Sequence, residues 1–84
     1  MIRYDFTKNA EKEFLKLPAG IQKRIIKKLE FFLKNPHPLI FARRMYGGSS
    51  FTYRFKIGHY RLIFDWEGKS ILILKVGHRK EIYR

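Results

Sequence analysis

The sequence contains no cysteine, and only seven of its 84 residues are acidic. The absence of cysteine excludes disulfide bonds, thiolate metal ligands and cysteine nucleophiles, so the fold has to be stabilised by packing. No stretch approaches the ~18 consecutive apolar residues of a membrane-spanning helix, and the N-terminus has no apolar signal region. We therefore expect a cytoplasmic protein with no membrane segment.

Basic residues dominate the charge: 19 Lys and Arg give a formal net charge of +12. Self-repulsion at this density costs stability unless a polyanion or an acidic partner offsets it. The alternative is an ordinary solvated surface, since Lys-rich helices are common in proteins that bind no nucleic acid. Because the basic residues recur on expected strands as well as on helices, we favour nucleic acid or an acidic protein as partner.

The length allows one small domain, which we place at residues 1–84. A chain of this size buries only roughly 60 to 65% of the surface that its unfolded form exposes. Eight Phe and five Tyr offer large side chains for a dense core.

Hydrophobic spacing predicts one strand and two helices before residue 36. Residues Ile2 to Phe6 alternate apolar with polar side chains, as a short strand does. Thr7 is the expected N-cap of a first helix, which Pro18 ends. A second helix is expected from Ala19 to Lys34, and the sequence Asn35-Pro36-His37-Pro38 stops it. The inner faces of the two helices are expected to carry Ala10, Phe14, Leu17, Ile21, Ile25, Leu29 and Phe32.

The sequence after Pro38 is predicted to form β-structure throughout, including a hairpin whose two-residue turn is Gly58-His59. On the core face this turn pairs Ile57 with Tyr60, Phe55 with Leu62, Tyr53 with Phe64 and Phe51 with Trp66. On the other face it pairs Lys56 with Arg61, Arg54 with Ile63 and Thr52 with Asp65. Two like charges directly opposite each other, Lys56 and Arg61, are a local cost, and such costs tend to mark ligand sites.

A last strand, Ile71 to Val76, is apolar on both faces and is expected in the middle of the sheet. A turn at residues 67–69 precedes it, and Gly77 is expected to end it. His78, Arg79 and Tyr83 then follow and are expected beside the basic set Arg54, Lys56 and Arg61. Residues that neighbouring strands bring to one edge can form a phosphate site without a metal.

Taken together, these segments resemble the RelE/ParE superfamily of bacterial and archaeal toxins, and within it the RelE-like mRNA interferases. The resemblance covers essentially the whole chain. It rests on the order of the first strand and Thr7–Phe14, Lys16-Leu17-Pro18, Asn35-Pro36, the hairpin Tyr53–Phe64, and the tail from Val76-Gly77-His78-Arg79 to Tyr83. It implies an α+β fold, with two N-terminal helices packed on one face of a small, mostly antiparallel sheet.

The resemblance also implies an activity. RelE-like toxins of type II toxin-antitoxin systems cleave mRNA, typically in the ribosomal A site, without a metal or other cofactor. They do so by attack of a ribose 2′-hydroxyl on the adjacent phosphate, which requires a proton acceptor, a proton donor and cations. The catalytic candidates are Arg54, Arg61, His78, Arg79 and Tyr83. The candidates for binding RNA phosphates are Arg54, Lys56, Arg61 and Lys80.

Arg54 departs from the family pattern, because RelE-like toxins often carry a catalytic Lys at this position. A guanidinium stabilises a phosphate but is a poor general base. His78, with an ordinary pKa of ~6.5, is the most natural acid or base, and its alternative is an exposed loop histidine. Tyr83 can stack on a nucleobase, or it can simply anchor the C-terminus on the sheet.

Two other functions stay open. A ParE-like inhibitor of DNA gyrase shares the fold but acts by binding a protein, and an inactive member would bind nucleic acid or antitoxin only. The resemblance implies a cognate antitoxin, expected to be acidic and partly disordered when free. The first expected strand and the segment Phe41 to Tyr46 are where it could dock.

Overall fold

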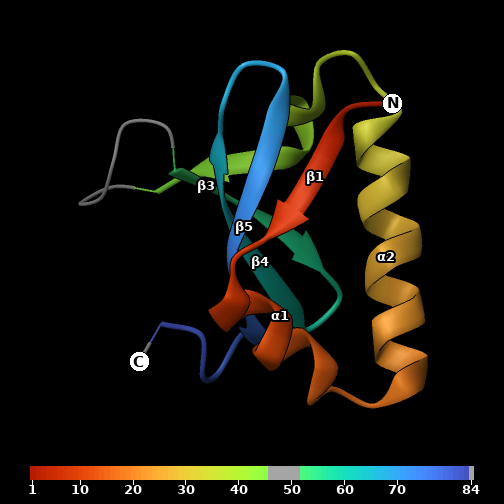
Figure 1. The fold of residues 1–84 in the computed structure, drawn as a ribbon, viewed down its shortest axis with the longest axis vertical. Coiled ribbons are helices and arrows are strands. Elements are labelled where there is room, and N and C mark those ends of the chain that lie inside the picture. The colour runs from red at the N-terminus through yellow and green to blue at the C-terminus, as the bar shows by residue number, and fades with distance from the viewer. Residues whose placement is uncertain (46–51, 84) are drawn as a thin grey trace.

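Residues 3–33 form a strand and two helices, and the later residues form most of a five-stranded sheet (Figure 1). The computed structural model describes residues 1–45 and 52–83. The elements are β1 (Arg3–Phe6), α1 (Lys8–Leu15), α2 (Ala19–Leu33), a 3₁₀ helix η1 (Pro38–Phe41), β2 (Ala42–Arg44), β3 (Thr52–Ile57), β4 (Tyr60–Trp66) and β5 (Ser70–His78).

The first helix begins where its capping residue predicts. The Thr7 hydroxyl accepts a hydrogen bond from the Ala10 amide at 3.1 Å, which satisfies one of the amides left free at a helix start. The helix ends at Leu15, so Leu17 lies beyond it and not on its inner face as expected. Pro18 then directly precedes α2, whose bounds differ from the prediction by one residue.

Apolar side chains on one side of α2 are buried, namely Ile25, Leu29, Phe32 and Leu33, whereas its lysines are exposed. Among the described residues, no helix combines the length and the apolar character needed to cross a membrane. The first four residues after the Pro36-His37 break form the 3₁₀ helix η1, which corrects the expectation of β-structure throughout this part of the chain. Pro38 starts η1 because its fixed φ suits the first position of a helix.

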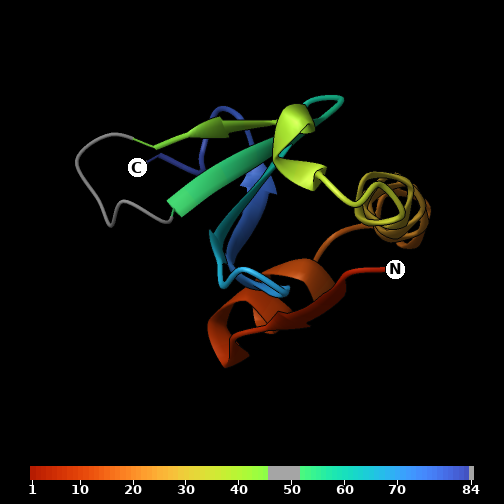
Figure 2. The ribbon, with the colours of Figure 1, turned by 90° about the horizontal axis from the view of Figure 1, so that it is seen from above.

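The strands lie in the order β1-β5-β4-β3-β2. β1 runs parallel to β5, and the other neighbours are antiparallel, so the sheet is mixed but mostly antiparallel. The last strand therefore lies between the first strand and the hairpin, in the interior of the sheet as predicted. Seen from above, α2 lies beside the strands, and α1 lies next to β1 at one edge of the sheet (Figure 2).

The predicted hairpin register is confirmed over the described residues. Ile57 pairs with Tyr60 across a two-residue turn, and Gly58 has φ +59°, a left-handed conformation that favours glycine. The register continues to Thr52 opposite Asp65, where the threonine hydroxyl donates to the carboxylate at 2.7 Å. The expected pair of Phe51 and Trp66 includes a residue that lies outside the described residues.

A β-bulge in β5 was not predicted, and it decides which side chains reach the core. Ile63 pairs with Lys75 but its neighbour Phe64 pairs with Ile73, so Leu74 is an extra residue in β5. Strict alternation from Ile73 would have directed Lys75 inward. The extra residue instead buries Val76 and leaves the Lys75 side chain exposed.

The expectation that Gly77 ends the last strand was wrong. Gly77 pairs with Arg61, and His78 pairs with Tyr60, so β5 continues to the hairpin turn. The Arg79 amide then donates to the His59 carbonyl at 2.8 Å. Gly77 has no left-handed φ that would interrupt the strand, and the partner strand β4 is available along its whole length.

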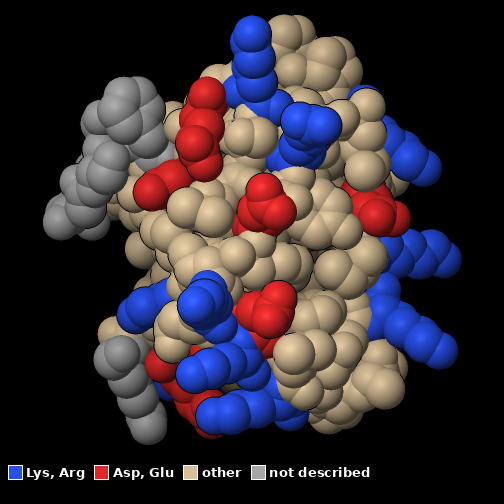
Figure 3. Space-filling model, in the orientation of Figure 1, with Lys and Arg blue, Asp and Glu red and all other residues tan. Residues whose placement is uncertain are grey.

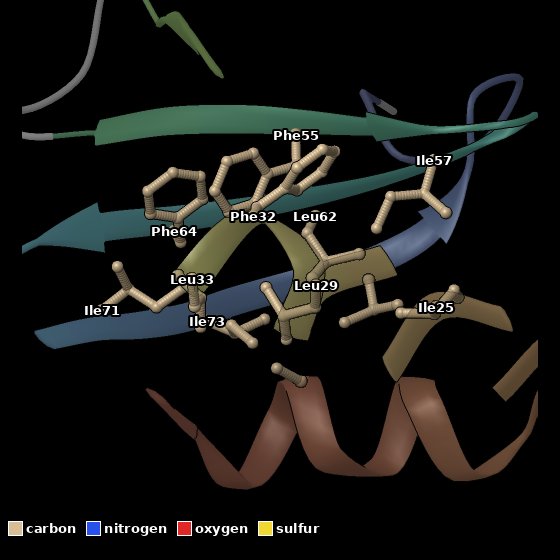
Figure 4. Packing of buried hydrophobic residues seen from close by; sticks show 12 residues of the cluster. Ile25, Leu29, Phe32, Leu33, Phe55, Ile57, Leu62, Phe64, Ile71 and Ile73 are labelled. Atoms are coloured by element: carbon tan, nitrogen blue, oxygen red, sulfur yellow. The ribbon is translucent and has the colours of Figure 1, made fainter. Parts of the chain in front are cut away.

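The core is a layer of aromatic and branched side chains between α2 and the inner face of the sheet (Figure 4). Phe55 is its centre: its ring lies 4.4 Å from the Phe64 ring and 4.7 Å from the Phe32 ring of α2, centroid to centroid. Such pairs contribute about 0.5–1.5 kcal/mol each beyond the burial of their area. Because Phe55 and Phe64 point to the helices, their strand neighbours must point to the opposite face.

A second contact ties the first strand to α2. The Tyr4 hydroxyl donates to the Glu30 carboxylate at 3.3 Å, and the Ile2 amide donates to the Leu33 carbonyl at 2.9 Å. Burial, together with the negative charge of Glu30, raises the pKa of Tyr4. Glu30 is therefore a partner of β1.

Candidate active site on the outer face of the sheet

The sheet face turned away from the helices, here called the outer face, carries rows of basic residues across neighbouring strands. Arg43 of β2 pairs with Arg54 of β3, and the row continues through Ile63 to Lys75 of β5. In the next row Lys56 lies opposite Arg61. Two pairs of like charges therefore lie directly opposite each other, a destabilising arrangement that an anion would relieve.

The C-terminal residues are held at β5 by a turn and a buried isoleucine. The amides of Glu81 and Ile82 donate to the His78 carbonyl at 2.9 and 3.0 Å. Ile82 is only 6% exposed, and a Cβ added at Gly77 would lie 3.6 Å from its Cδ1 atom. The anchor of the tail is thus Ile82, which leaves Tyr83 half-exposed and free for another contact.

Tyr83 contacts Arg54. An Nη atom of Arg54 donates to the Tyr83 hydroxyl at 3.0 Å, and the guanidinium carbon lies 5.8 Å from the centroid of the tyrosine ring. The Arg54 Nε–H is buried and has no partner among the described residues. Unpaired buried donors are uncommon in folded proteins, and they suit a site that a ligand completes.

A cleft of about 610 Å³ opens beside this contact, lined by Arg43, Arg44, Met45, Arg54 and Tyr83. Neither Arg43 nor Arg44 was among the residues predicted for the site. Two consecutive arginines in the sequence are a signal for an anion-binding position. Only the register of β2 against β3, however, places Arg43 opposite Arg54.

Arg61 is 7% exposed, and one of its Nη atoms donates to the carbonyls of Gly58 and Tyr60 at 2.9 and 2.8 Å. It therefore stabilises the hairpin turn, and part of its donor capacity is already used. Lys56, opposite it, is exposed.

His78 lies apart from the Arg54–Tyr83 contact. It pairs with Tyr60, its ring centroid lies 5.5 Å from the Tyr60 ring and 5.9 Å from the His59 ring, and its Nδ1 accepts from the Lys80 amide at 3.1 Å. It lines a different cleft, together with Glu13 of α1 and Glu81. The side chains of Arg79 and Lys80 are exposed beside the hairpin turn.

No group of three or more His, Asp or Glu side chains with the spacing of a metal site occurs in residues 1–45 and 52–83.

Comparison with known proteins assigns the family. A family model described as "ParE toxin of type II toxin-antitoxin system, parDE" matches residues 4–83, nearly the whole chain. The chain belongs to the RelE/ParE superfamily of type II toxins. No match was found among proteins with curated functions.

Solved structures of RelE toxins share the fold of this RelE/ParE toxin. The RelE of the RelB-RelE complex from Methanococcus jannaschii is 28% identical, with a TM-score of 0.72 and 93% of each chain covered. The intact Escherichia coli RelBE complex contains a similar chain, 26% identical with a TM-score of 0.71, covering 93% of this chain and 96% of that one. The isolated E. coli RelE toxin matches at 26% identity and a TM-score of 0.73, covering 93% of this chain and 84% of that one.

The anchoring role of Ile82 gives a test of how the tail is held. Replacing this 6%-exposed side chain by alanine should lower the free energy of unfolding by about 2 kcal/mol, the lower end for a buried Ile near a chain end. Denaturant unfolding would measure it. Gly77→Ala is the matched control, since its Cβ fits at ordinary contact distance and the change should stay within about 0.5 kcal/mol. An Ile82→Ala variant as stable as the parent would show that the tail is not anchored there.

Proposed function

We propose that this toxin is an endoribonuclease that cleaves mRNA in the ribosomal A site by metal-independent attack of a 2′-hydroxyl on the adjacent phosphate. The observation that carries the proposal is the Arg54–Tyr83 contact at the edge of a basic cleft on the outer face. The resemblance to RelE structures along nearly the whole chain supports it.

The cations of the outer face suit the charge that develops on the phosphoryl oxygens. The Arg54 Nε donor has no partner within residues 1–45 and 52–83, and guanidinium groups bind phosphate in a bidentate manner. Arg43 lies opposite it across the strands and can hold a neighbouring phosphate. We infer that the positive charge of this face extends toward the hairpin turn through the side chains of Lys56, Arg61, Arg79 and Lys80.

Proton transfer is assigned to two other groups. Because the Tyr83 hydroxyl accepts a hydrogen bond from Arg54, its own proton remains free to be donated to the leaving 5′-oxygen. Guanidinium groups stay protonated, so the arginines of this face are poor acceptors for the proton of the 2′-hydroxyl. The outer face also carries the lysines Lys56 and Lys75, and we assign the acceptor role to Lys56, which lies two residues from Arg54 on the same face of β3. His78, the expected acid or base, lines another cleft and is not assigned this role.

A second candidate function is inhibition of DNA gyrase by protein binding. The match to a ParE family model favours it, because ParE-like relatives act in this way. It requires no arrangement of proton carriers, so the substitutions below separate it from RNA cleavage. The third possibility, an inactive member that only binds, predicts neither cleavage nor loss of supercoiling.

The cleavage proposal is tested by primer extension on an mRNA in a translating extract, with the parent protein and with Arg79→Ala. New 3′ ends inside the A-site codon should appear with the parent and fall about 10²- to 10³-fold with Arg79→Ala, the usual effect of removing one preorganised charge donor. Arg79 is exposed and its backbone makes the turn contact, so the fold should persist. Arg24→Ala, an exposed arginine on α2, is the control. Intact mRNA with a protein that still arrests growth would reject the proposal, and a gyrase supercoiling assay would test the alternative.

The role of Lys56 is tested by Lys56→Arg, which keeps the positive charge and removes the titratable amine. Single-turnover cleavage should fall about 10²- to 10⁴-fold, while RNA binding changes little because the charge is retained. His78→Ala, in the separate cleft, should cost less than about tenfold. If Lys56→Arg cleaves at the parent rate, another group accepts the proton, and a large loss with His78→Ala would return that role to the histidine.

The antitoxin is proposed to be an acidic segment that folds on binding and covers the outer face, including Arg61 and Arg79. Similar toxins have been crystallised with RelB antitoxins, and the charge of +12 favours an acidic partner. Toxin saturated with the antitoxin should lose cleavage activity. Full activity in the saturated complex would place the antitoxin elsewhere.

A further inference from the structure

The cleft that contains His78 lies between α1 and the last residues of β5. β1 pairs with β5 only as far as Ile73, because the chain turns into α1 after Phe6. From Leu74 onward this edge of β5 is therefore not paired with β1, and α1 lies against it instead (Figure 1). The space between them is a cleft of about 550 Å³, here called the α1–β5 cleft. It is separate from the cleft beside Arg54 and Tyr83.

The walls of the α1–β5 cleft suit a flat ligand. The rings of Tyr60 and His78 lie 5.5 Å apart, centroid to centroid, at an angle of 77°. A planar ring can therefore lie against the face of one of them and meet the edge of the other. Apolar side chains complete these walls, namely Leu17, Val76 and Ile82.

Carboxylates supply the hydrogen-bond acceptors of this cleft. Oε1 of Glu13 accepts from the Val76 amide at 3.1 Å, and this bond holds the carboxylate at the edge of β5. It leaves the second oxygen, Oε2, able to accept from a ligand, because a carboxylate has about four lone-pair sites. Glu81, which is exposed, lines the same cleft. A complementary ligand therefore presents N–H groups to this wall.

A donor and a cation lie in the same lining. His78 Nδ1 accepts from the Lys80 amide at 3.1 Å, so we assign the proton of the neutral ring to Nε2, which makes Nε2 a donor. Lys16 of α1 adds an exposed ammonium group. The cleft thus combines one N–H donor, carboxylate acceptors and one positive charge.

We propose that the α1–β5 cleft binds the guanine base of a nucleotide. The Watson–Crick edge of guanine carries the O6 acceptor beside the N1–H and N2–H donors, which complements His78 Nε2–H and the Glu13 carboxylate. The base lies against an aromatic ring of the cleft, and Lys16 contacts the phosphate. Adenine, cytosine and uracil each lack at least one of the two adjacent donors. A free guanine nucleotide and a guanosine of RNA present the same chemistry, and the test separates these sources.

An arginine side chain or a polyamine also presents N–H donors, but the surrounding charge disfavours it. The chain carries a net charge of +12, and Lys16 lines the cleft beside the carboxylates. In the space-filling view, the acidic side chains at the level of α1 lie among basic ones (Figure 3). This field repels a cationic ligand and attracts the phosphate of a nucleotide.

The test titrates the full-length chain, labelled with ¹⁵N, with the 5′-monophosphates of guanosine, inosine and adenosine. The guanosine nucleotide should shift the amides of Glu13, Val76 and Glu81. The inosine nucleotide lacks the N2 amino group and should bind about three- to tenfold more weakly, and the adenosine nucleotide at least about tenfold more weakly. Equal affinity for the guanosine and adenosine nucleotides, or shifts confined to the outer face, would overturn the proposal. The titration needs neither ribosome nor mRNA, so its result is independent of the proposed cleavage activity.

The acceptor role is tested by Glu13→Gln, whose amide oxygen can still accept from the Val76 amide while its NH₂ group opposes the donors of guanine. Binding of the guanosine nucleotide should weaken at least about tenfold, with a thermal unfolding midpoint close to that of the parent. Glu11→Gln, exposed on α1 outside the cleft lining, is the matched control and should change binding less than about twofold. Equal effects of the two substitutions would contradict the proposal.

Lys16→Ala tests where the phosphate lies. It should weaken the guanosine nucleotide about threefold and leave the nucleoside guanosine unaffected, because only the nucleotide carries a phosphate. An equal loss for both ligands would contradict the assignment of the phosphate to this lysine.

The two sources of guanine are separated with a single-stranded RNA oligonucleotide that carries one central guanosine, and with the same oligonucleotide carrying adenosine there. Shifts of the cleft amides that require the guanosine would identify a position within RNA as the ligand. Cleft amides that respond to the free nucleotide but not to either oligonucleotide would identify the nucleotide itself.

Discussion

The fold depends on the two-residue turn at Gly58, because that turn sets which face of the sheet each hairpin residue occupies. With Ile57 opposite Tyr60, Phe55 and Phe64 point to α2 and form the centre of the core. The same alternation requires Arg54, Lys56 and Arg61 to point the other way. A shift of the register by one residue would bury the cations and expose the phenylalanines, so packing of the core and placement of the basic residues are one constraint.

The concentration of positive charge on the outer face is costly, and the structure offsets only part of it. Arg61 donates to two carbonyls at the turn, and Arg54 contacts the hydroxyl and ring of Tyr83. Arg43 opposite Arg54 and Lys56 opposite Arg61 remain like-charge pairs. A fold selected for stability alone would not keep such pairs, which supports the proposed binding of a polyanion to this face.

Local sequence signals predicted the elements well where one residue type decides the backbone. Thr7 caps α1, and Gly58 has the positive φ of a tight turn. The predictions failed where a contact between distant segments decides. β5 continues past Gly77 because β4 supplies a pairing partner, and the bulge at Leu74 keeps Lys75 out of the core. Neither feature has a local signal, since both depend on how β5 aligns with another strand.

By itself the sequence determined the hairpin register, the two helices, the alternation of basic and apolar residues, and the resemblance to RelE/ParE toxins. Only the tertiary structure decided which candidates share a site. It joins Tyr83 to Arg54 through the anchor Ile82, and it adds Arg43 and Arg44 through the β2–β3 pairing. It places His78 in another cleft. Gly77 pairs with Arg61 of the outer face, and the next residue along a strand points to the opposite face of the sheet. Proximity in sequence fixes which face a side chain occupies, but the distances across strands arise only when the chain folds.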